Sequence, residues 1–306
     1  MKKAYIILAH KNPDQLHALI DRLSDGKSDF FIHIDLKSPL YKERRSLTET
    51  LSITLVDSIS TAWGTMGLVH ATLEAMKKIK VTGKQFEKII LLSGQDYPVK
   101  TNEEIDSFYQ SSPHRIFLDF SILPNYTKWK TGGGSYRIEK YFFGYSFFEK
   151  YAARLLNFLA SFLPFLKRRF DSVRHFYGSQ WFTIDMYSLN FIVDYVAQNP
   201  DYLAFHQHTF APDELFFQTI LLNSGRPEIL GGIVNDNKVF MMRENESDAH
   251  PKTLVSSDFE RIVSSSALFA RKFDPETDSL ILQLIDQNCL QQKKIMKELP
   301  GNENAA

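Results

Sequence analysis

Residues 4–13 have the sequence AYIILAHKNP, and this stretch decides how the N-terminal part of the chain folds. An apolar run is followed at once by polar residues and a proline, which are typical of a turn. Residues 1–3 (MKK) and this run resemble the start of a signal peptide, but the run is short and no small-residue cleavage site follows it. The stretch therefore predicts a buried first strand that ends in a polar loop.

The first 120 residues repeat this alternation of apolar runs with helical patterns. We expect strands at 4–9, 30–34, 53–56, 88–92 and 115–118, and helices at 12–23, 40–50, 66–79 and 102–110. This order predicts an α/β fold with a Rossmann-like, mainly parallel central sheet flanked by helices. Further along we expect strands at 180–184 and 239–242, helices at 187–197, 213–222, 258–264 and 279–297, and a mobile loop at 126–141.

Length and composition are those of one folded domain. The chain has 306 residues, 43% of them hydrophobic, and its 36 basic and 36 acidic residues leave no net charge that would favour nucleic acid. Cys289 is the single cysteine, which excludes an intrachain disulfide framework and a cysteine-rich zinc site. Without a repeat or a low-complexity linker, we expect one domain at 1–299, with a nucleotide-binding half at 1–120, an acceptor-side and catalytic half at 121–299, and a flexible tail at 300–306.

The loops that follow the expected strands are rich in polar residues. They have the sequences HKNP (10–13), HIDLKS (33–38), STAWG (60–64) and SGQDYP (93–98). Ligands bind at the carboxyl ends of parallel strands, so these loops predict a nucleotide or sugar cleft. Neither a Gly-x-Gly-x-x-Gly nor a P-loop pattern is present, so a dinucleotide or P-loop site lacks support.

A pair of adjacent acids, Asp213 and Glu214, follows Pro212 and precedes an apolar run. One interpretation is the first turn of a helix, where proline is tolerated and negative charge is favoured. The other is a general base that faces a cleft. The motif alone leaves both open.

Taken together, six segments resemble the core-2/I-branching glycosyltransferase family, which includes peptide xylosyltransferases. The segments occur in the family's order at 4–10, 33–38, 93–98, 178–182, 212–214 and 268–274. The resemblance implies a GT-A type fold and an inverting, metal-independent transfer that forms a β-linked sugar from a UDP-sugar co-substrate. The first candidate donor is UDP-GlcNAc, followed by UDP-xylose and UDP-glucose. By this resemblance Glu214 is the general base and Asp213 supports it.

The resemblance also implies fixed cations in place of a metal at the UDP diphosphate, and no Asp-x-Asp motif is present. Lys272 matches the family's phosphate-binding lysine, with Lys252 and Arg271 as further candidates. No cofactor is expected, because the UDP-sugar is a substrate. The other donor-site candidates are Ala9, His10, Asp35, Lys37, Trp63, Gly94, Gln95 and Asp96.

Candidate acceptor residues are Trp129, Arg137, Lys140, Ser179, Gln180 and Asp213. For His10 and His33 a satisfied core histidine is an equal alternative, and Trp63 either stacks on a ring or packs. The acceptor is expected to be a glycan or a lipid-linked glycan. A non-catalytic nucleotide- or glycan-binding module is the second interpretation, and a glycoside hydrolase with paired carboxylates ranks below it, because adjacent residues early in a helix point about 100° apart.

In the segment 154–169 apolar residues crowd 155–166, and three basic residues follow at once, Lys167, Arg168 and Arg169. It predicts either a peripheral contact with an anionic membrane or a buried helix with a basic last turn. Animal family members carry an N-terminal membrane anchor and extra cysteines. We therefore expect a bacterial-type cytoplasmic protein, peripheral at the inner face of the plasma membrane if the segment binds lipid.

Overall fold

The computed structural model describes residues 1–44, 52–245, 248 and 250–290. The chain divides into two compact units, each built from three separate stretches. Unit 1 contains Met1–Lys11, Gly26–Ser93 and Ser112–Asn237, and unit 2 contains Asn12–Asp25, Gly94–Ser111 and Lys238–Ala306. The boundaries differ from the expected halves at residue 120, and a single domain at 1–299 stays a prediction.

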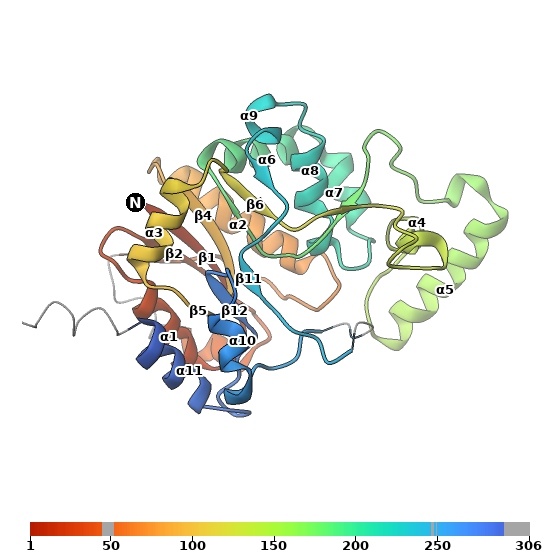
Figure 1. The fold of residues 1–306 in the computed structure, drawn as a ribbon. Coiled ribbons are helices and arrows are strands. Elements are labelled where there is room, and N and C mark those ends of the chain that lie inside the picture. Colours follow the sequence, from red (N-terminus) through yellow and green to blue (C-terminus); the bar gives the residue numbers. More distant parts are fainter. Residues whose placement is uncertain (45–51, 246–247, 249, 291–306) are drawn as a thin grey trace, which may run out of the picture. The chain divides into compact units, whose positions relative to one another are not determined.

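Unit 1 is built on a seven-stranded sheet of order β10-β6-β9-β4-β1-β2-β3. Neighbouring strands pair in parallel except β9, which is antiparallel to both β4 and β6. The mainly parallel α/β architecture is therefore confirmed (Figure 1). The strands are β1 (Lys3–Ala9), β2 (Asp29–Ile34), β3 (Ile53–Leu55), β4 (Lys88–Ser93), β6 (Ile116–Leu118), β9 (Phe182–Ile184) and β10 (Ile233–Val234).

The centre of this sheet explains the apolar runs in the sequence. Every residue of β1 is buried, and so is every residue of β4. Helix α2 (Gly67–Val81) packs on β1 and β2, and helix α6 (Met186–Gln198) packs on β4. The Asp185 side chain caps α6 by accepting from the Ser188 N–H.

The rest of unit 1 consists of the long helix α5 and several short elements. The helices are α4 (Tyr136–Glu139), α5 (Phe147–Phe162), α7 (Pro200–His206), α8 (Phe216–Leu222) and α9 (Pro227–Leu230). A two-stranded antiparallel ribbon joins β7 (Ser121–Ile122) to β8 (Phe176–Tyr177). The expected helix at 40–50 overlaps only a 3-10 turn at Pro39–Lys42, and residues 45–50 lie outside the described part. Within the described residues, no helix is long and apolar enough to cross a membrane.

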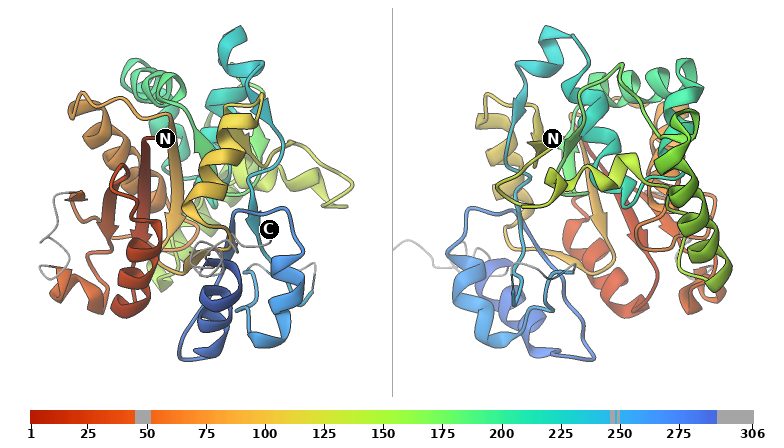
Figure 2. Two further views of the ribbon diagram at one scale, coloured as in Figure 1. Left: turned by 60° about the vertical axis from the view of Figure 1, so that its left-hand side comes forward. Right: turned by 90° about the vertical axis from the view of Figure 1, so that its right-hand side faces the viewer.

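Unit 2 has a three-stranded sheet of order β11-β12-β5. Its C-terminal helices are seen in blue from two further sides in Figure 2. Its strands are β11 (Val239–Phe240), β12 (Phe269–Arg271) and β5 (Asp96–Pro98), and its helices are α1 (Pro13–Leu23), α3 (Asn102–Ser111), α10 (Phe259–Val263) and α11 (Leu280–Ile285). Helix α1 starts with proline, and its buried residues, such as Leu16 and Leu19, recur at helical spacing. The expected helix at 279–297 is observed as α11 and a π-helical turn, Asp286–Leu290; its remainder and the tail at 300–306 lie outside the described residues.

Candidate active site

The Pro-Asp-Glu motif forms a 3-10 turn of its own, so the prediction of one continuous helix at 213–222 was wrong at its start. The turn covers Pro212–Glu214, and α8 begins only at Phe216. Ala211 before the turn is left-handed with φ 50°, and Leu215 after it leaves helical geometry with φ −128°. Proline fits the first position of an α-helix and of a 3-10 helix, so the motif did not distinguish between the two. The turn separates its two acids: Asp213 is 5% exposed, whereas the Glu214 side chain is 36% exposed.

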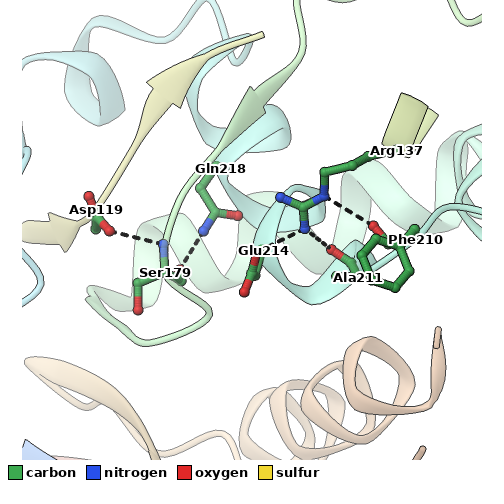
Figure 3. Close-up of polar contacts among 7 residues, drawn as sticks. All are labelled: Asp119, Arg137, Ser179, Phe210, Ala211, Glu214 and Gln218. Carbon is green, nitrogen blue, oxygen red and sulfur yellow. Dashed lines mark hydrogen bonds and ion pairs between the residues drawn. The ribbon is translucent and has the colours of Figure 1, made fainter. Parts of the chain in front are cut away.

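Arg137 holds the Glu214 carboxylate (Figure 3). Its Nη2 donates to Glu214 Oε2 at 2.8 Å and to the Ala211 carbonyl at 2.9 Å. Its Nε donates to the Phe210 carbonyl at 3.3 Å. Arg137 lies in α4 and is 3% exposed, so the expectation of a mobile loop at 126–141 was wrong here. A buried guanidinium bound on one side to two carbonyls fixes the orientation of a partly exposed carboxylate.

The neighbouring acid, Asp213, is in a different environment. Burial and the adjacent Glu214 raise the pKa of Asp213 to about 7, against the opposing effect of Arg137. No hydrogen-bond partner is found for its Oδ1 atom. The two carboxyl groups of the motif therefore differ in exposure and in partners.

Asp35 directly follows β2 and organises the loop at 33–38. Its Oδ1 accepts from the Lys37 N–H at 2.7 Å, and its Oδ2 accepts from the Thr61 N–H at 2.8 Å and from the Thr61 hydroxyl. The Asp35 N–H donates to the Ala9 carbonyl at 2.9 Å. Since a carboxylate oxygen has two lone pairs, Oδ1 can still accept from a ribose hydroxyl. Thr61 was not among the predicted site residues, although its loop (60–64) was.

Trp63 and Gly64 connect that loop to the Pro-Asp-Glu turn at 212–214. The Trp63 ring, 38% exposed, stacks on Tyr145 with centroids 6.1 Å apart and meets the Phe210 ring edge-on at 5.4 Å. The Ala211 N–H donates to the Gly64 carbonyl at 2.9 Å. Asp35, Trp63 and Glu214 therefore belong to one continuous set of contacting segments in unit 1.

The two histidines for which alternatives were open, His10 and His33, differ in burial. His33 is 1% exposed, and its Nε2 accepts from the Ile59 N–H at 3.0 Å. Burial lowers the pKa of His33. The core-histidine alternative is thus confirmed for His33 and was wrong for His10, which is exposed, as is Lys37.

The segment 178–180 lies directly beside the Pro-Asp-Glu turn (Figure 3). The Gly178 N–H donates to the Glu214 carbonyl at 2.8 Å, and the Gln218 amide donates to the Ser179 carbonyl at 2.6 Å. A Cβ atom on Gly178 would lie 1.7 Å from the Asp119 carbonyl oxygen, so only glycine fits. The Gln180 Nε2 is buried and lacks a hydrogen-bond partner.

Of two further predicted acceptor residues, Trp129 packs against the cluster that contains Leu215, next to the turn, whereas Lys140 contacts Arg168. The half-buried Trp129 ring packs on Tyr177 with centroids 4.7 Å apart. Lys140 is exposed, and its carbonyl accepts from Arg168 at 2.6 Å. Their role toward an acceptor stays a prediction.

The predicted diphosphate residues belong to unit 2. Arg271 Nε donates to Oδ1 of the fully buried Asp96 at 3.0 Å, and Lys252 pairs with Asp258 at 2.9 Å. The Leu254 N–H donates to the Lys272 carbonyl at 2.9 Å, which places the segment after Lys252 beside Lys272. The three cations therefore occur on two adjacent segments.

Gly94 and Gln95 are buried at the start of β5 in the same unit. The Gln95 amide donates to the Phe273 carbonyl at 3.2 Å, and the Phe273 N–H returns a bond of 2.9 Å to the Gln95 carbonyl. These two contacts hold the chain directly after Lys272. Among the residues that the structure describes, no group of three or more His, Cys, Asp or Glu side chains could hold a metal ion. Metal independence stays a prediction.

Comparison with known proteins identifies the family. A family model described as Core-2/I-Branching enzyme matches residues 3–264. The chain is 27% identical to xylosyltransferase 2 of Rattus norvegicus over 316 residues, covering 92% of this chain and 33% of that protein. It is 22% identical over 321 residues to a human protein named probable beta-1,3-galactosyl-O-glycosyl-glycoprotein beta-1,6-N-acetylglucosaminyltransferase 7, covering 97% of this chain and 70% of that one.

The chain belongs to the Core-2/I-Branching enzyme family. It spans about a third of the length of the xylosyltransferases that it matches. Mouse xyloside xylosyltransferase 1 in its apo form aligns with a TM-score of 0.34 at 11% identity, covering 88% of this chain and 97% of that one.

Proposed function

We propose that the chain is a glycosyltransferase that moves a sugar from a UDP-sugar to a hydroxyl group of a glycan, with inversion to a β-linkage. Family membership supports the reaction class, and the Arg137–Glu214 pair is the observation that carries the assignment of the base. GlcNAc is the first candidate for the transferred sugar, with xylose or glucose next.

In the proposed mechanism, the acceptor hydroxyl attacks the anomeric carbon of the donor from the side opposite the diphosphate. Glu214 accepts the proton of that hydroxyl, and the carbon–oxygen bond to the diphosphate breaks. Arg137 contributes by keeping the carboxylate in one orientation, since its own position is fixed by the Phe210 and Ala211 carbonyls. A base that is held in position raises the rate of the reaction, because it loses little orientational freedom when the transition state forms.

Negative charge develops on the leaving UDP and must be stabilised. We assign this role to Lys272, Arg271 and Lys252, because cations that are fixed before the reaction stabilise developing charge without reorganisation. Asp35 is assigned to a ribose hydroxyl through the remaining lone pair on Oδ1. No metal is required by this assignment.

The test uses the purified chain, a panel of UDP-sugars with GDP-mannose and free UDP, and buffers with and without EDTA. We expect UDP-specific binding that survives EDTA, and Glu214→Gln should abolish transfer while UDP binding by calorimetry is retained. The matched control is Glu228→Gln at an exposed position of α9. Transfer by the Glu214→Gln variant would contradict the assignment of the base. Nucleotide binding without turnover of any sugar would instead support a binding module.

A further inference from the structure

Helix α5 in unit 1 presents a row of large apolar side chains to solvent. It starts with a capping box, in which the Ser146 and Glu149 side chains each accept a backbone N–H of the other residue. Figure 1 shows α5 at the end of unit 1 away from the strands β1 and β4. The exposed apolar residues of this segment are Phe147, Phe148, Tyr151, Leu155, Phe158, Leu159, Phe162, Leu163 and Phe165.

These side chains share one face of the helix. At 100° per residue, the seven that lie within α5 cover an arc of roughly 120°. The opposite face is attached to the rest of unit 1: Ala160 is buried, and the Asn157 side chain accepts from the Tyr141 N–H at 2.8 Å and donates to its carbonyl at 3.0 Å. The alternative of a buried helix at 154–169 was therefore wrong, because the apolar face points outward.

Basic residues accompany this face. Lys150 and Arg154 are exposed on α5, and Lys167 and Arg169 are exposed just after it. Between residues 147 and 169 the sequence has five basic residues and a single acid, Glu149, which serves the capping box. The apolar face of α5 is therefore flanked by an excess of positively charged side chains.

The basic end of the segment is held in place by hydrogen bonds of Arg168. Arg168 is 7% exposed and donates to the carbonyls of Lys140 and Phe205 at 2.6 Å and to the Thr209 hydroxyl at 2.9 Å. Beside it lies a cavity of about 480 Å³ whose charged lining consists of Glu139, Lys140, Lys167, Arg168, Arg169 and Asp171. Four cations against two acids give this cavity an excess of positive charge. Because Asn157 and Ala160 also line it, the cavity lies on the attached side of α5 and not on the apolar face.

We propose that the apolar face of α5 docks on a membrane surface rich in anionic phospholipid. The helix has 16 residues, which is roughly 24 Å and too short to span a bilayer, so it lies along the interface. Aromatic side chains enter the boundary between head groups and acyl chains, while the flanking lysine and arginine side chains meet the lipid phosphates. A second copy of the chain is the poorer occupant, because stacking two such faces brings their basic residues together. The proposal does not depend on the transferase activity.

The test is co-sedimentation of the full chain with vesicles, without any sugar nucleotide. One set of vesicles is phosphatidylcholine alone, and the other contains equal parts phosphatidylcholine and phosphatidylglycerol. We expect tighter binding to the anionic vesicles by at least about 30-fold at low salt, since each of several cations near the surface contributes. Equal binding to both vesicle types, or no binding to either, would overturn the proposal.

Two paired variants separate the contributions. Phe158→Ser with Phe162→Ser should weaken binding at least about tenfold, because two aromatic side chains no longer enter the interface. The matched control is Val81→Ser with Leu230→Ser, two other exposed apolar positions of unit 1. Circular dichroism verifies folding, and unchanged vesicle binding by the Phe158/Phe162 variant would refute the docking face.

The second pair, Lys167→Glu with Arg169→Glu, should reduce binding to the anionic vesicles about 30-fold or more and leave binding to neutral vesicles unchanged. Lys130→Glu with Arg226→Glu, at exposed positions of unit 1, is its control. Sedimentation velocity completes the test. A dimer of the unchanged chain that the Phe158/Phe162 variant dissociates would assign the face to a second copy and overturn the lipid proposal.

Discussion

Replacement of Arg137 tests the contact on which the candidate active site depends. The Arg137→Met change keeps a long side chain in α4 but removes the guanidinium. It leaves the Phe210 and Ala211 carbonyls without this donor, and it leaves the Glu214 carboxylate without its cation. The change can be measured by urea unfolding, without knowledge of the donor or acceptor.

The expected loss of stability follows from the exposure of each partner. Glu214 is 36% exposed, so solvent screens the ion pair and it contributes about 1 kcal/mol rather than the 3–5 of a fully buried pair. The two carbonyl contacts add about 1 kcal/mol each, because their donor is 3% exposed and water replaces it incompletely. We therefore expect Arg137→Met to lower the free energy of unfolding by about 3 kcal/mol.

A double-mutant cycle isolates the pair itself. Combining Arg137→Met with Glu214→Gln should show a coupling energy of about 1 kcal/mol, since the two side chains are in direct contact. Arg154→Met, at an exposed position of α5, is the control and should change stability by less than about 0.5 kcal/mol. If the two changes prove additive within about 0.3 kcal/mol, the pair does not hold Glu214 and the reasoning fails.

Three further changes probe other parts of the molecule. Lys272→Ala should weaken UDP binding about 30-fold in calorimetry and leave uridine binding nearly unchanged, because the lysine is proposed to contact the diphosphate. Asp213→Asn should remove a pH dependence of stability. The pKa of Asp213 is raised from 3.8 to about 7 on folding, so its contribution is fully present below about pH 4 and is lost as the pH rises through 7, by at most about 4 kcal/mol. Gly178→Ala should destabilise the chain by more than about 3 kcal/mol, because its Cβ would lie 1.7 Å from the Asp119 carbonyl oxygen.

Each of these expectations has a contrary result. Equal weakening of UDP and uridine binding by Lys272→Ala, or a comparable effect of the exposed Arg261→Ala, would remove the lysine from the diphosphate. Identical stability–pH curves for the unchanged chain and Asp213→Asn would show that this carboxyl is not the titrating group. The control for Gly178→Ala is Gly232→Ala, whose Cβ would meet nothing nearer than 3.3 Å, and equal losses would contradict the steric argument.

The strands of unit 1 could be predicted from sequence because burial on both faces leaves a continuous apolar run. This is the case for β1 and β4, which were expected nearly to the residue. The direction of β9 could not be predicted, since a short apolar segment is compatible with parallel and antiparallel neighbours alike. It is the antiparallel strand between β4 and β6.

Only part of the candidate site is marked by local patterns in the sequence. Glu214 and Asp35 are marked by local patterns, a proline before two acids and a carboxylate at a strand end. Their partners are not: Arg137 is 77 residues from Glu214, and Thr61 is 26 residues from Asp35. An arginine in a glycine-rich segment is typical of an exposed loop, and only the folded chain brings the Phe210 and Ala211 carbonyls that bury it.

The interleaved make-up of unit 2 has a consequence for how the chain is synthesised. Helix α1 leaves the ribosome early, yet Asn12 bonds to Asp274, 262 residues later, and Asp96 bonds to Arg271, 175 residues later. The early segments of this unit can contact one another, as α1 and β5 do, but their bonds to Arg271 and Asp274 form only after residues 271–274 have been translated. Fragments that stop near residue 237 would contain every segment of unit 1 but would leave α1, β5 and α3 without their C-terminal partners. We expect such fragments to refold poorly, to bind chaperones and to be cleaved readily by proteases.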